Sequence, residues 1–279
     1  MILSTINQGL LWAILGLGIF MTFRILNFPD MTTEGSFPLG GAVAVTLITQ
    51  GVNPFIATFV AFLAGCAAGL ITGLLYTKGK IPTLLAGILV MTSCNSIMLM
   101  VMGRANLGLL GADKLKSTWI SVSAVLLVLL LIFYFLNTNL GQAFIATGDN
   151  VEMAQSFGIN TGRMEVLGLV VSNGVIALSG ALISQNDGYA DVSKGIGVIV
   201  IGLASIIIGE VFFGNVSLFE RLFAIVIGSI FYQFLILAVI KLGFNTNYLK
   251  LFSAIVLAIC LMIPTFKDKF FKGVKLNAE

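Results

Sequence analysis

The charged residues of this chain are separated by long uncharged stretches. Runs without Asp, Glu, Lys or Arg cover 1–23, 35–77, 81–103, 117–148, 166–186, 195–209, 222–240 and 251–266. A helix that crosses a bilayer needs about 20 mostly apolar residues. The run 35–77 is long enough for two helices, with a turn at Gln50-Gly51-Val52-Asn53-Pro54. The run 195–209 reaches Phe213 if Glu210 lies near an interface, so we expect about nine hydrophobic segments.

These segments are expected to be helices. Backbone groups in lipid must be hydrogen-bonded internally, and no alternating pattern typical of a barrel is present. The first run has no Lys or Arg before it, unlike a cleavable signal, so it is counted as a span. The pattern predicts an all-α, polytopic transmembrane bundle of about 8–10 membrane segments, forming a single domain over 1–279. A broken or re-entrant segment around 28–50 would reverse the orientation of the N-terminus.

Composition agrees with this fold class. Hydrophobic residues make up 58% of the 279 positions and charged residues 10%, with a mean hydropathy of +1.07. Soluble domains carry about 25% charged residues, so the chain is expected to lie in a lipid bilayer. The net charge of +3 is spread over several loops and does not indicate nucleic-acid binding.

The absence of histidine and the positions of the three cysteines limit the kinds of active or metal site that the chain can form. The chain has no histidine, which excludes His-based metal sites, catalytic triads and His proton relays. Cys66, Cys94 and Cys260 lie inside apolar runs and are interpreted as small buried hydrophobic residues. We therefore expect no catalytic residues, no metal and no cofactor.

Basic residues predict the orientation. The segment 267–275 is the densest basic cluster, which the positive-inside rule places in the cytoplasm. Counting back through the spans puts 76–81, 138–165 and 214–221 on the same side. It puts 104–117, 186–194 and 241–250 on the outside, while the orientation of the first 50 residues stays open.

The longest internal polar segment, 137–165, contains a predicted short helix. Asp149 can cap the helix, and Glu152 lies three residues further on. Gly158 can adopt the left-handed conformation that ends a helix. This leaves about two turns at 150–157, which are too short to be stable alone in water. The helix is therefore expected to be held by its own protein or by a partner, or to lie on the membrane surface.

Within this segment the chain resembles ABC importer permeases of the branched-chain amino-acid and ribose type. The stretch 146–160 is similar to their cytoplasmic signature, although Ile145 stands where that signature has arginine. In the family this signature forms the coupling helix that docks on the ATPase. The resemblance therefore implies a coupling loop at about 138–165 whose contact residues are Ala146, Gly148, Asp149, Asn150, Met153, Ala154, Phe157, Gly158 and Ile159.

Two further stretches resemble a subgroup, the small uncharacterised or tryptophan-type permeases. They are 28–40 and 185–204, so the resemblance covers nearly the whole chain. It implies a multi-pass protein of the bacterial cell membrane with a cytoplasmic C-terminus, and a substrate that is a small polar solute such as an amino acid. The implied partners are a cytoplasmic ABC ATPase, an extracellular solute-binding lipoprotein and a second permease copy, which makes a homodimer. A heterodimer with another permease is the alternative.

Polar residues near or within the apolar runs are candidates for the translocation pathway. Asp30, Glu34, Asp187, Asp191 and Glu210 stand at the ends of predicted spans, so we expect them at the membrane interface. The pathway candidates are Asp30, Thr32, Glu34, Ser36, Asn95, Asn173, Gln185 and Asn186. The alternative for the uncharged residues is hydrogen bonding between helices.

Small residues recur every four positions in the second half of the run 35–77. They are Ala61, Gly65, Gly69 and Gly73, and such a face lets helices approach closely in lipid. Packing inside the bundle and contact with another subunit both fit this pattern.

Two classes of function remain. A self-contained secondary transporter or channel should show a central carboxylate or broken helices in corresponding halves, and the sequence shows neither clearly. An intramembrane enzyme would need a nucleophile and base that the chain does not offer. No Gly-x-x-x-x-Gly-Lys-Ser/Thr loop is present, so ATP hydrolysis would reside in a separate subunit. We predict the permease subunit of an ATP-driven importer.

Overall fold

The computed structural model describes residues 2–109, 118–214 and 217–241, together with residues 251, 254, 255 and 258. In this part of the chain, helices dominate and one pair of short strands is present. The elements in chain order are α1 (Ile2–Ile19), the π-helix η1 (Phe20–Ile25), α2 (Thr33–Thr49), α3 (Pro54–Thr77), α4 (Thr83–Met102), β1 (Asn106–Gly108), α5 (Thr118–Leu136), α6 (Asn139–Asp149), α7 (Val151–Ser156), α8 (Thr161–Asp187), β2 (Tyr189–Asp191), the 3-10 helix η2 (Val192–Gly195), α9 (Val198–Phe213) and α10 (Leu218–Lys241).

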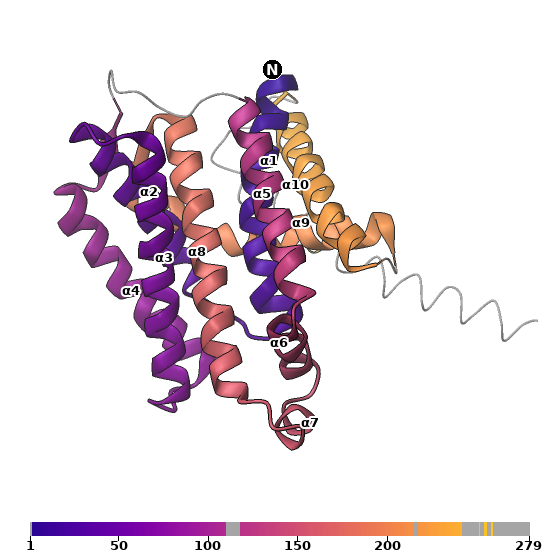
Figure 1. Cartoon of the computed structure of the whole chain (residues 1–279). Helices are drawn as coiled ribbons and strands as arrows, with labels where there is room; N and C mark the ends of the chain where they lie inside the picture. Colours follow the sequence, from indigo (N-terminus) through magenta and orange to yellow (C-terminus); the bar gives the residue numbers. More distant parts are fainter. Residues whose placement is uncertain are drawn as a thin grey trace, which may run out of the picture.

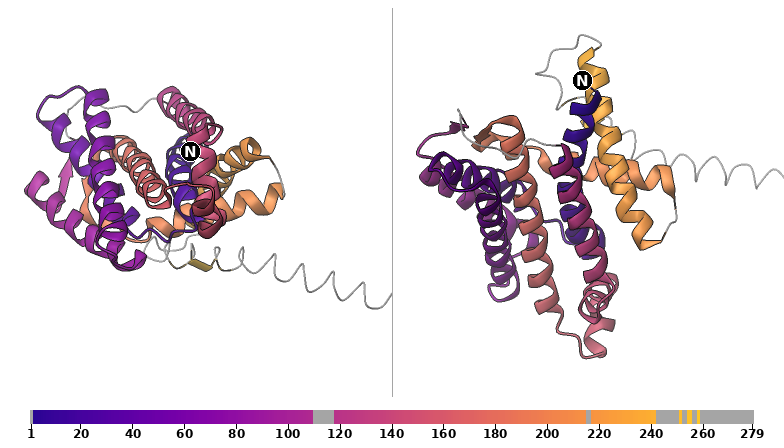
Figure 2. Two further views of the ribbon diagram at one scale, coloured as in Figure 1. Left: turned by 60° about the horizontal axis from the view of Figure 1, so that its bottom comes forward. Right: turned by 45° about the horizontal axis from the view of Figure 1, so that its top comes forward.

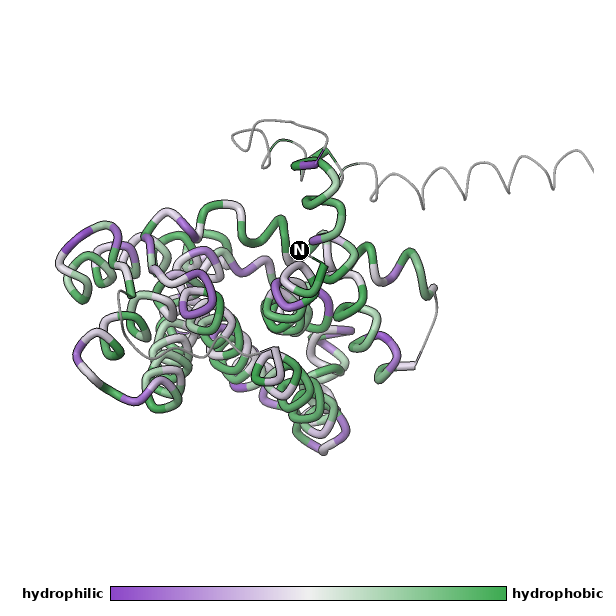
Figure 3. The backbone as a smooth tube through the Cα atoms, turned by 90° about the horizontal axis from the view of Figure 1, so that it is seen from above, coloured by the Kyte–Doolittle hydropathy of each residue, from purple (hydrophilic) through white to green (hydrophobic). Residues whose placement is uncertain are grey.

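Seven helical stretches among the described residues are long and apolar enough to cross a membrane. They are Ile2–Ile25, Pro54–Thr77, Thr83–Met102, Thr118–Leu136, Thr161–Asp187, Val192–Phe213 and Leu218–Lys241. The tube in Figure 3 shows hydrophobic residues along most helices. The predicted polytopic helical bundle is confirmed. The expected last span at 251–266, apart from four residues, and the basic tail lie outside the described residues.

The connections gather at two ends of the bundle (Figure 1). One end holds α6 and α7, together with the connections from α3 to α4 and from α7 to α8. The other end holds the antiparallel pair of β1 and β2, in which Leu107 is opposite Ala190. The N-terminus lies at this second end, where Asn7 donates a hydrogen bond to Asn186. We call these the α7 end and the strand end.

The run 35–77 forms two helices, as predicted. Gly51 between them has a φ of 86°, a conformation that favours glycine. The side chain of Asn53 caps α3 by accepting the Phe55 N–H at 2.9 Å, and Pro54 occupies the first turn of α3, where it needs no donor. The local sequence therefore accounts for this turn.

The helical structure is interrupted between α1 and α2, inside the bundle. The π-helix η1 follows α1, and Asn27 then takes a φ of 53°, which is unusual for a residue other than glycine. Thr32 and Thr33 at the start of α2 are fully buried. At 17 residues, α2 is shorter than the seven candidate spans. The structure thus places a broken segment in the predicted region 28–50.

Helix α8 lies in the centre of the bundle. It separates a group formed by α2, α3 and α4 from a group that includes α1, α5 and α10 (Figures 1 and 2). Its strongest contact is with α3, through the small residues predicted from their spacing. A Cβ atom at Gly65 would overlap the carbonyl oxygen of Asn173, and one at Gly69 would overlap that of Leu169. This small-residue face therefore packs inside the bundle, not against another subunit.

The two described cysteines differ in burial. Cys94 is buried in α4, as predicted. Cys66 in α3 is only half-buried, beside the α8 residue Gly174. Cys260 lies outside the described residues.

The contact between α3 and α8 can be tested with the substitution Gly69→Val. We expect it to destabilise the protein by about 3 kcal/mol, because the added side chain meets backbone and not a flexible side chain. The matched control is Ala67→Val, at an exposed position of the same helix. The measurement is chemical or thermal unfolding in detergent, and equal stability of the two variants would contradict the packing described.

Candidate functional site

The α7 end is built from two helices with separate caps. Thr138 caps α6 by accepting the Gly141 N–H at 3.2 Å. The side chain of Asn150 caps α7 by accepting the Met153 N–H at 2.9 Å. The predicted cap at Asp149 is wrong, because Asp149 is the last residue of α6 and α7 begins after Asn150. Helix α6 was not predicted from the sequence.

Helix α7 presents apolar side chains to solvent. Phe157 is 76% exposed and Met153 is 48% exposed, whereas Ala154 is fully buried. Gly158 has a φ of 80° and, as predicted, ends the helix. The Ile159 N–H closes the turn on the carbonyl oxygen of Ala154 at 3.0 Å. An apolar surface of this kind is typical of a contact with another protein.

The end of α6 contacts the break between α1 and α2. The amide of Asn27 donates to the carbonyl oxygen of Gly148 at 3.1 Å. A Cβ atom at Gly148 would overlap the carbonyl oxygen of Ile25, so only glycine allows this approach. Ala146, one turn before the end of α6, accepts the Asn150 N–H at 3.1 Å. The predicted coupling residues therefore connect an exposed surface with the interior of the bundle.

Four of the predicted pathway residues form one buried cluster. The amide of Asn173 in α8 donates to Asp30 at 2.7 Å and accepts from the Ser36 hydroxyl at 2.5 Å. Asp30 also accepts the Thr32 N–H at 2.9 Å, and the Thr32 hydroxyl lies 2.8 Å from that of Thr72 in α3. All five residues are fully buried. The cluster thus joins α2, α3 and α8 through hydrogen bonds.

The predicted interfacial position of Asp30 is wrong. Its carboxylate is fully buried against Asn173, near the middle of α8. The chain break brings residue 30 back into the bundle, which spacing along the sequence does not reveal. A buried carboxylate needs hydrogen-bond donors, and here Asn173 and the Thr32 backbone provide them.

Two predicted pathway residues lie elsewhere, towards the strand end. Gln185 is fully buried, and its amide donates to the Thr58 hydroxyl at 2.8 Å. Asn186 is half-buried and donates to Gln8 at 3.0 Å. Both amides therefore join helices, which was the alternative considered for them.

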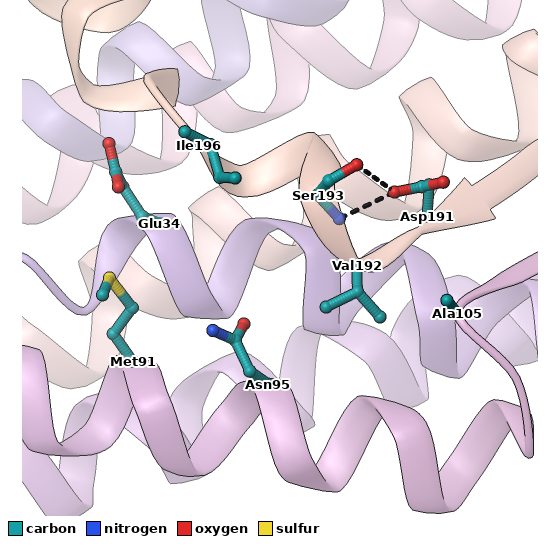
Figure 4. Close-up of a pocket in the computed structure, with 8 residues that line it drawn as sticks. All are labelled: Glu34, Met91, Asn95, Ala105, Asp191, Val192, Ser193 and Ile196. Carbon is teal, nitrogen blue, oxygen red and sulfur yellow. Dashed lines mark hydrogen bonds between the residues drawn. The ribbon is translucent and has the colours of Figure 1, made fainter.

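Glu34 and Asn95 line a pocket of about 360 Å³. It lies between α2, α4 and the chain from β2 to α9 (Figure 4). The remaining lining residues are Met91, Ala105, Asp191, Val192, Ser193 and Ile196. One carboxylate oxygen of Glu34 accepts the Gly197 N–H at 2.9 Å. The pocket therefore combines carboxylate, amide and hydroxyl groups with an apolar wall.

Asp191 and Ser193 in this pocket were not among the predicted pathway residues. Partial burial alone would raise the pKa of Asp191, but hydrogen bonds from Ser193 and Asn106 and the charge of Lys194 together lower it below its ordinary value. Asp191 therefore stays ionised at neutral pH. Its spacing of two residues from Ser193 is a signal of an Asx turn, which sequence analysis could have used.

Two ion pairs are present among the described residues. Arg24 of η1 binds Glu210 of α9 through two contacts of 2.8 and 2.6 Å. Lys194 binds Asp187 at 2.7 Å and lies over the ring of Tyr189, 3.7 Å from its centroid. The first pair ties the break after α1 to α9, and the second holds η2 to the end of α8.

Comparisons with known proteins agree with this architecture. The sequence model of the family described as "Branched-chain amino acid transport system / permease component" matches residues 1–261. The chain is 43% identical over 261 residues to the tyrosine transport system permease protein of Clostridioides difficile (strain R20291), with 92% of this chain and 88% of that protein covered. It is 25% identical to the ribose import permease protein RbsC of Haemophilus influenzae, with 95% and 85% covered.

A solved structure shares the fold. The complex of PsaBC from Streptococcus pneumoniae with a Fab contains a chain that superposes with a TM-score of 0.55. The two chains are 18% identical, and 93% of this chain and 88% of that chain are covered. At this identity the similarity establishes the fold alone.

The buried cluster can be tested with the substitution Asn173→Leu. We expect a loss of about 2–3 kcal/mol of stability, because the carboxylate of Asp30 loses a buried donor. Thr72→Val is the control, since it removes only hydrogen bonds between neutral groups, those with Thr32 and with the Ala68 carbonyl, and should cost about 1 kcal/mol. Unfolding in detergent is the measurement, and a smaller effect for Asn173→Leu than for Thr72→Val would show that the cluster does not stabilise the bundle.

Proposed function

The chain belongs to the permease-component family of branched-chain amino acid transport systems, and we propose that the solute it conducts is an amino acid. Members of this family are membrane subunits of ABC importers and are not enzymes themselves. ATP hydrolysis belongs to a separate ATPase subunit, and the family implies a substrate-binding partner. The 43% identity to a protein described as a tyrosine transport permease supports an amino acid as the solute.

The surface of α7 is proposed as the docking site for the ATPase. The observation that carries this proposal is the exposure of Phe157 and Met153 at the end of the bundle. Large apolar side chains on a short helix are exposed at a cost unless a partner covers them, and aromatic residues are frequent anchors of protein interfaces. Under this proposal the α7 end lies in the cytoplasm of a bacterial cell. The C-terminus, which lies outside the described residues, is proposed to be cytoplasmic because of its basic residues.

Motion at α7 is proposed to reach the bundle through α6. Gly148 contacts the backbone at Ile25, and Asn27 holds Gly148 by a hydrogen bond. The next residues along the chain lead to Asp30, whose carboxylate binds Asn173 in the central helix α8. Closure of the ATPase subunits would thus act on the broken segment between α1 and α2.

A complete importer would contain two copies of this chain as a homodimer, with the solute-binding protein on the strand end. Glu34 and Asn95 are proposed to line the pathway, because they are the predicted residues that reach a pocket. Asp30, Thr32, Ser36 and Asn173 have no exposed surface, so we propose that they act on the pathway by holding the broken segment. Gln185 and Asn186 are proposed to hold the helices at the strand end.

One observation favours a second candidate, a secondary transporter that works without ATP. The buried carboxylate of Asp30 lies beside a broken helix, which is the arrangement expected at an ion-coupled site. Under that reading, transport would depend on Asp30 and an ion gradient, and would need no partner.

The docking surface can be tested with the substitution Phe157→Ala. We expect it to weaken recovery of the ATPase with the tagged chain by about 2 kcal/mol, or roughly 30-fold in affinity, without a loss of stability, because the side chain is exposed. Trp119→Ala is the matched control, because Trp119 is 82% exposed at the opposite end of α5 from α6. The measurement is a pull-down from gently solubilised membranes. Equal recovery with both variants would rule out α7 as the dock.

Transport itself can be measured as uptake of radiolabelled L-tyrosine into proteoliposomes that contain the chain with its ATPase and binding protein. We expect uptake to require ATP, and Gly148→Ala to reduce it on the order of tenfold, because the added methyl pushes α6 away from Ile25. Gly162→Ala is the control, since its methyl group would have room. ATP-independent uptake would favour the secondary transporter, and ribose uptake without tyrosine uptake would reject the amino acid.

A further inference from the structure

The outward faces of most spans carry apolar residues, as expected beside lipid. Helix α3 exposes Phe59, Leu63 and Leu70, and α5 exposes Leu126 and Leu130. Side chains of this kind need no partner in a bilayer other than the lipid chains. The exposed faces of α3 and α5 therefore serve as the reference for a lipid-facing, mainly apolar surface of this protein.

The outward face of α4 differs in its middle, where polar side chains lie between exposed apolar ones such as Leu89 and Ile97. Thr92, Ser93 and Ser96 are exposed in the middle of this helix, and Asn95 between them is half-exposed. We call these four residues the polar turn of α4. The helix is also the least buried of the seven candidate spans. The most exposed span of the described bundle thus carries hydroxyl and amide groups at membrane depth.

Lipid is a poor environment for this turn. The hydroxyls of Thr92 and Ser93 donate to the carbonyl oxygen of Leu89 at 2.9 and 2.8 Å, but their own oxygen atoms can still accept hydrogen bonds. Hydroxyl and amide groups within spans usually hydrogen-bond across a helix contact or to water. Because the polar turn does not face the interior of the described bundle, its acceptors and the Asn95 amide need water or another polar surface.

The pocket described above lies beside the polar turn. Asn95, a member of the turn, and Met91, one helical turn before it, line the pocket together with Glu34. Figure 4 shows Asn95 pointing from α4 towards the segment that carries Ser193. Glu34 contributes a carboxylate to the lining, and Asp191 contributes a second one that is held ionised. A negative pocket therefore continues directly into the polar turn.

We propose that the polar turn of α4 and the adjoining pocket form one wetted wall of the solute pathway, with a negative charge that favours solutes carrying an ammonium group. This inference rests on the proposed permease function, in which a second copy of the chain closes the pathway. Met91, Val192 and Ile196 supply an apolar surface for the body of the solute. An amino acid has both features.

The test uses single cysteines in a full-length variant whose three native cysteines are replaced by alanine. Thr92→Cys, Asn95→Cys and Ser96→Cys are treated in membrane fragments with a cationic thiol reagent, trimethylammonioethyl methanethiosulfonate, and with its anionic sulfonatoethyl counterpart. Only the thiolate reacts, and it forms where water is present. The matched control is Leu126→Cys, because Leu126 is 57% exposed in the middle of α5.

We expect the three α4 positions to be labelled and Leu126→Cys to remain unlabelled. At Asn95→Cys the cationic reagent should react at least about tenfold faster than the anionic one, and Glu34→Gln should remove most of this preference. Absence of labelling at Thr92→Cys and Ser96→Cys would overturn the proposal. So would thiol cross-linking between copies without labelling, which would show a dry subunit contact.

The labelling experiment needs neither ATP nor the ATPase, so its result tests the wetted wall separately from the proposed importer function. ATP-driven uptake of tyrosine together with an unlabelled polar turn would reject the wetted wall and leave the permease function intact. A labelled polar turn in a chain without ATP-driven uptake would retain the wetted wall and reject the importer.

Discussion

The carboxylate of Asp30 is fully buried, so its hydrogen-bond donors have to come from the protein itself. Asn173 meets that need from the middle of α8, and the same amide accepts a hydrogen bond from Ser36 of α2. The Asn173 amide donates to the connection before α2 and accepts from α2 itself, which fixes its orientation and links α2 to α8. Helix α3 also approaches α8 closely, since Gly65 meets the carbonyl of Asn173 and Gly69 meets that of Leu169.

The same constraint explains the shape of the chain before α2. The π-helix η1 follows α1, and the chain then turns at Asn27, which has a positive φ. After this turn Asp30 lies within hydrogen-bonding distance of Asn173. Gly148 of α6 contacts this segment at Ile25 and Asn27, and the ion pair of Arg24 and Glu210 joins it to α9. Several contacts from α6, α9 and α8 meet at this segment, which is why we propose that a displacement of α6 is transmitted through it to the bundle.

Polar residues of this protein therefore serve two physical roles. Those of the Asp30 cluster hydrogen-bond to one another and join helices, whereas those in the middle of α4 are left exposed or half-exposed by the described residues. In the proposed importer, the first group transmits movement and the second group faces the moving solute. The division also explains how a buried carboxylate can occur in a transporter driven by ATP: a carboxylate that is fully hydrogen-bonded supports structure and need not bind an ion.

Much of the architecture could be predicted from the sequence, because it depends on interactions between near neighbours. The spans follow from uncharged runs, the turn at Gly51 and Asn53 from local conformational preferences, and the end of α7 from Gly158. The resemblance to the permease family was recognisable because the glycine and alanine spacing of 146–160 is local too. The cap of α7 was not, because Asp149 and Asn150 are both good capping residues and only the structure shows that Asn150 caps the helix.

Only the tertiary structure decided which polar residues are buried and which are exposed. Asp30 and Glu34 are four positions apart in the sequence, yet Asp30 is fully buried against Asn173 of α8 while Glu34 lines a pocket. Likewise, Thr72 of α3 and Thr92 of α4 have the same chemistry within apolar helices, but Thr72 faces Thr32 and Thr92 faces outward. Hydropathy measures the preference of a segment for lipid, whereas the direction of each side chain depends on which helices become neighbours. That pairing depends on contacts between residues far apart in the sequence, 40 positions for Thr32 and Thr72 and 143 for Asp30 and Asn173.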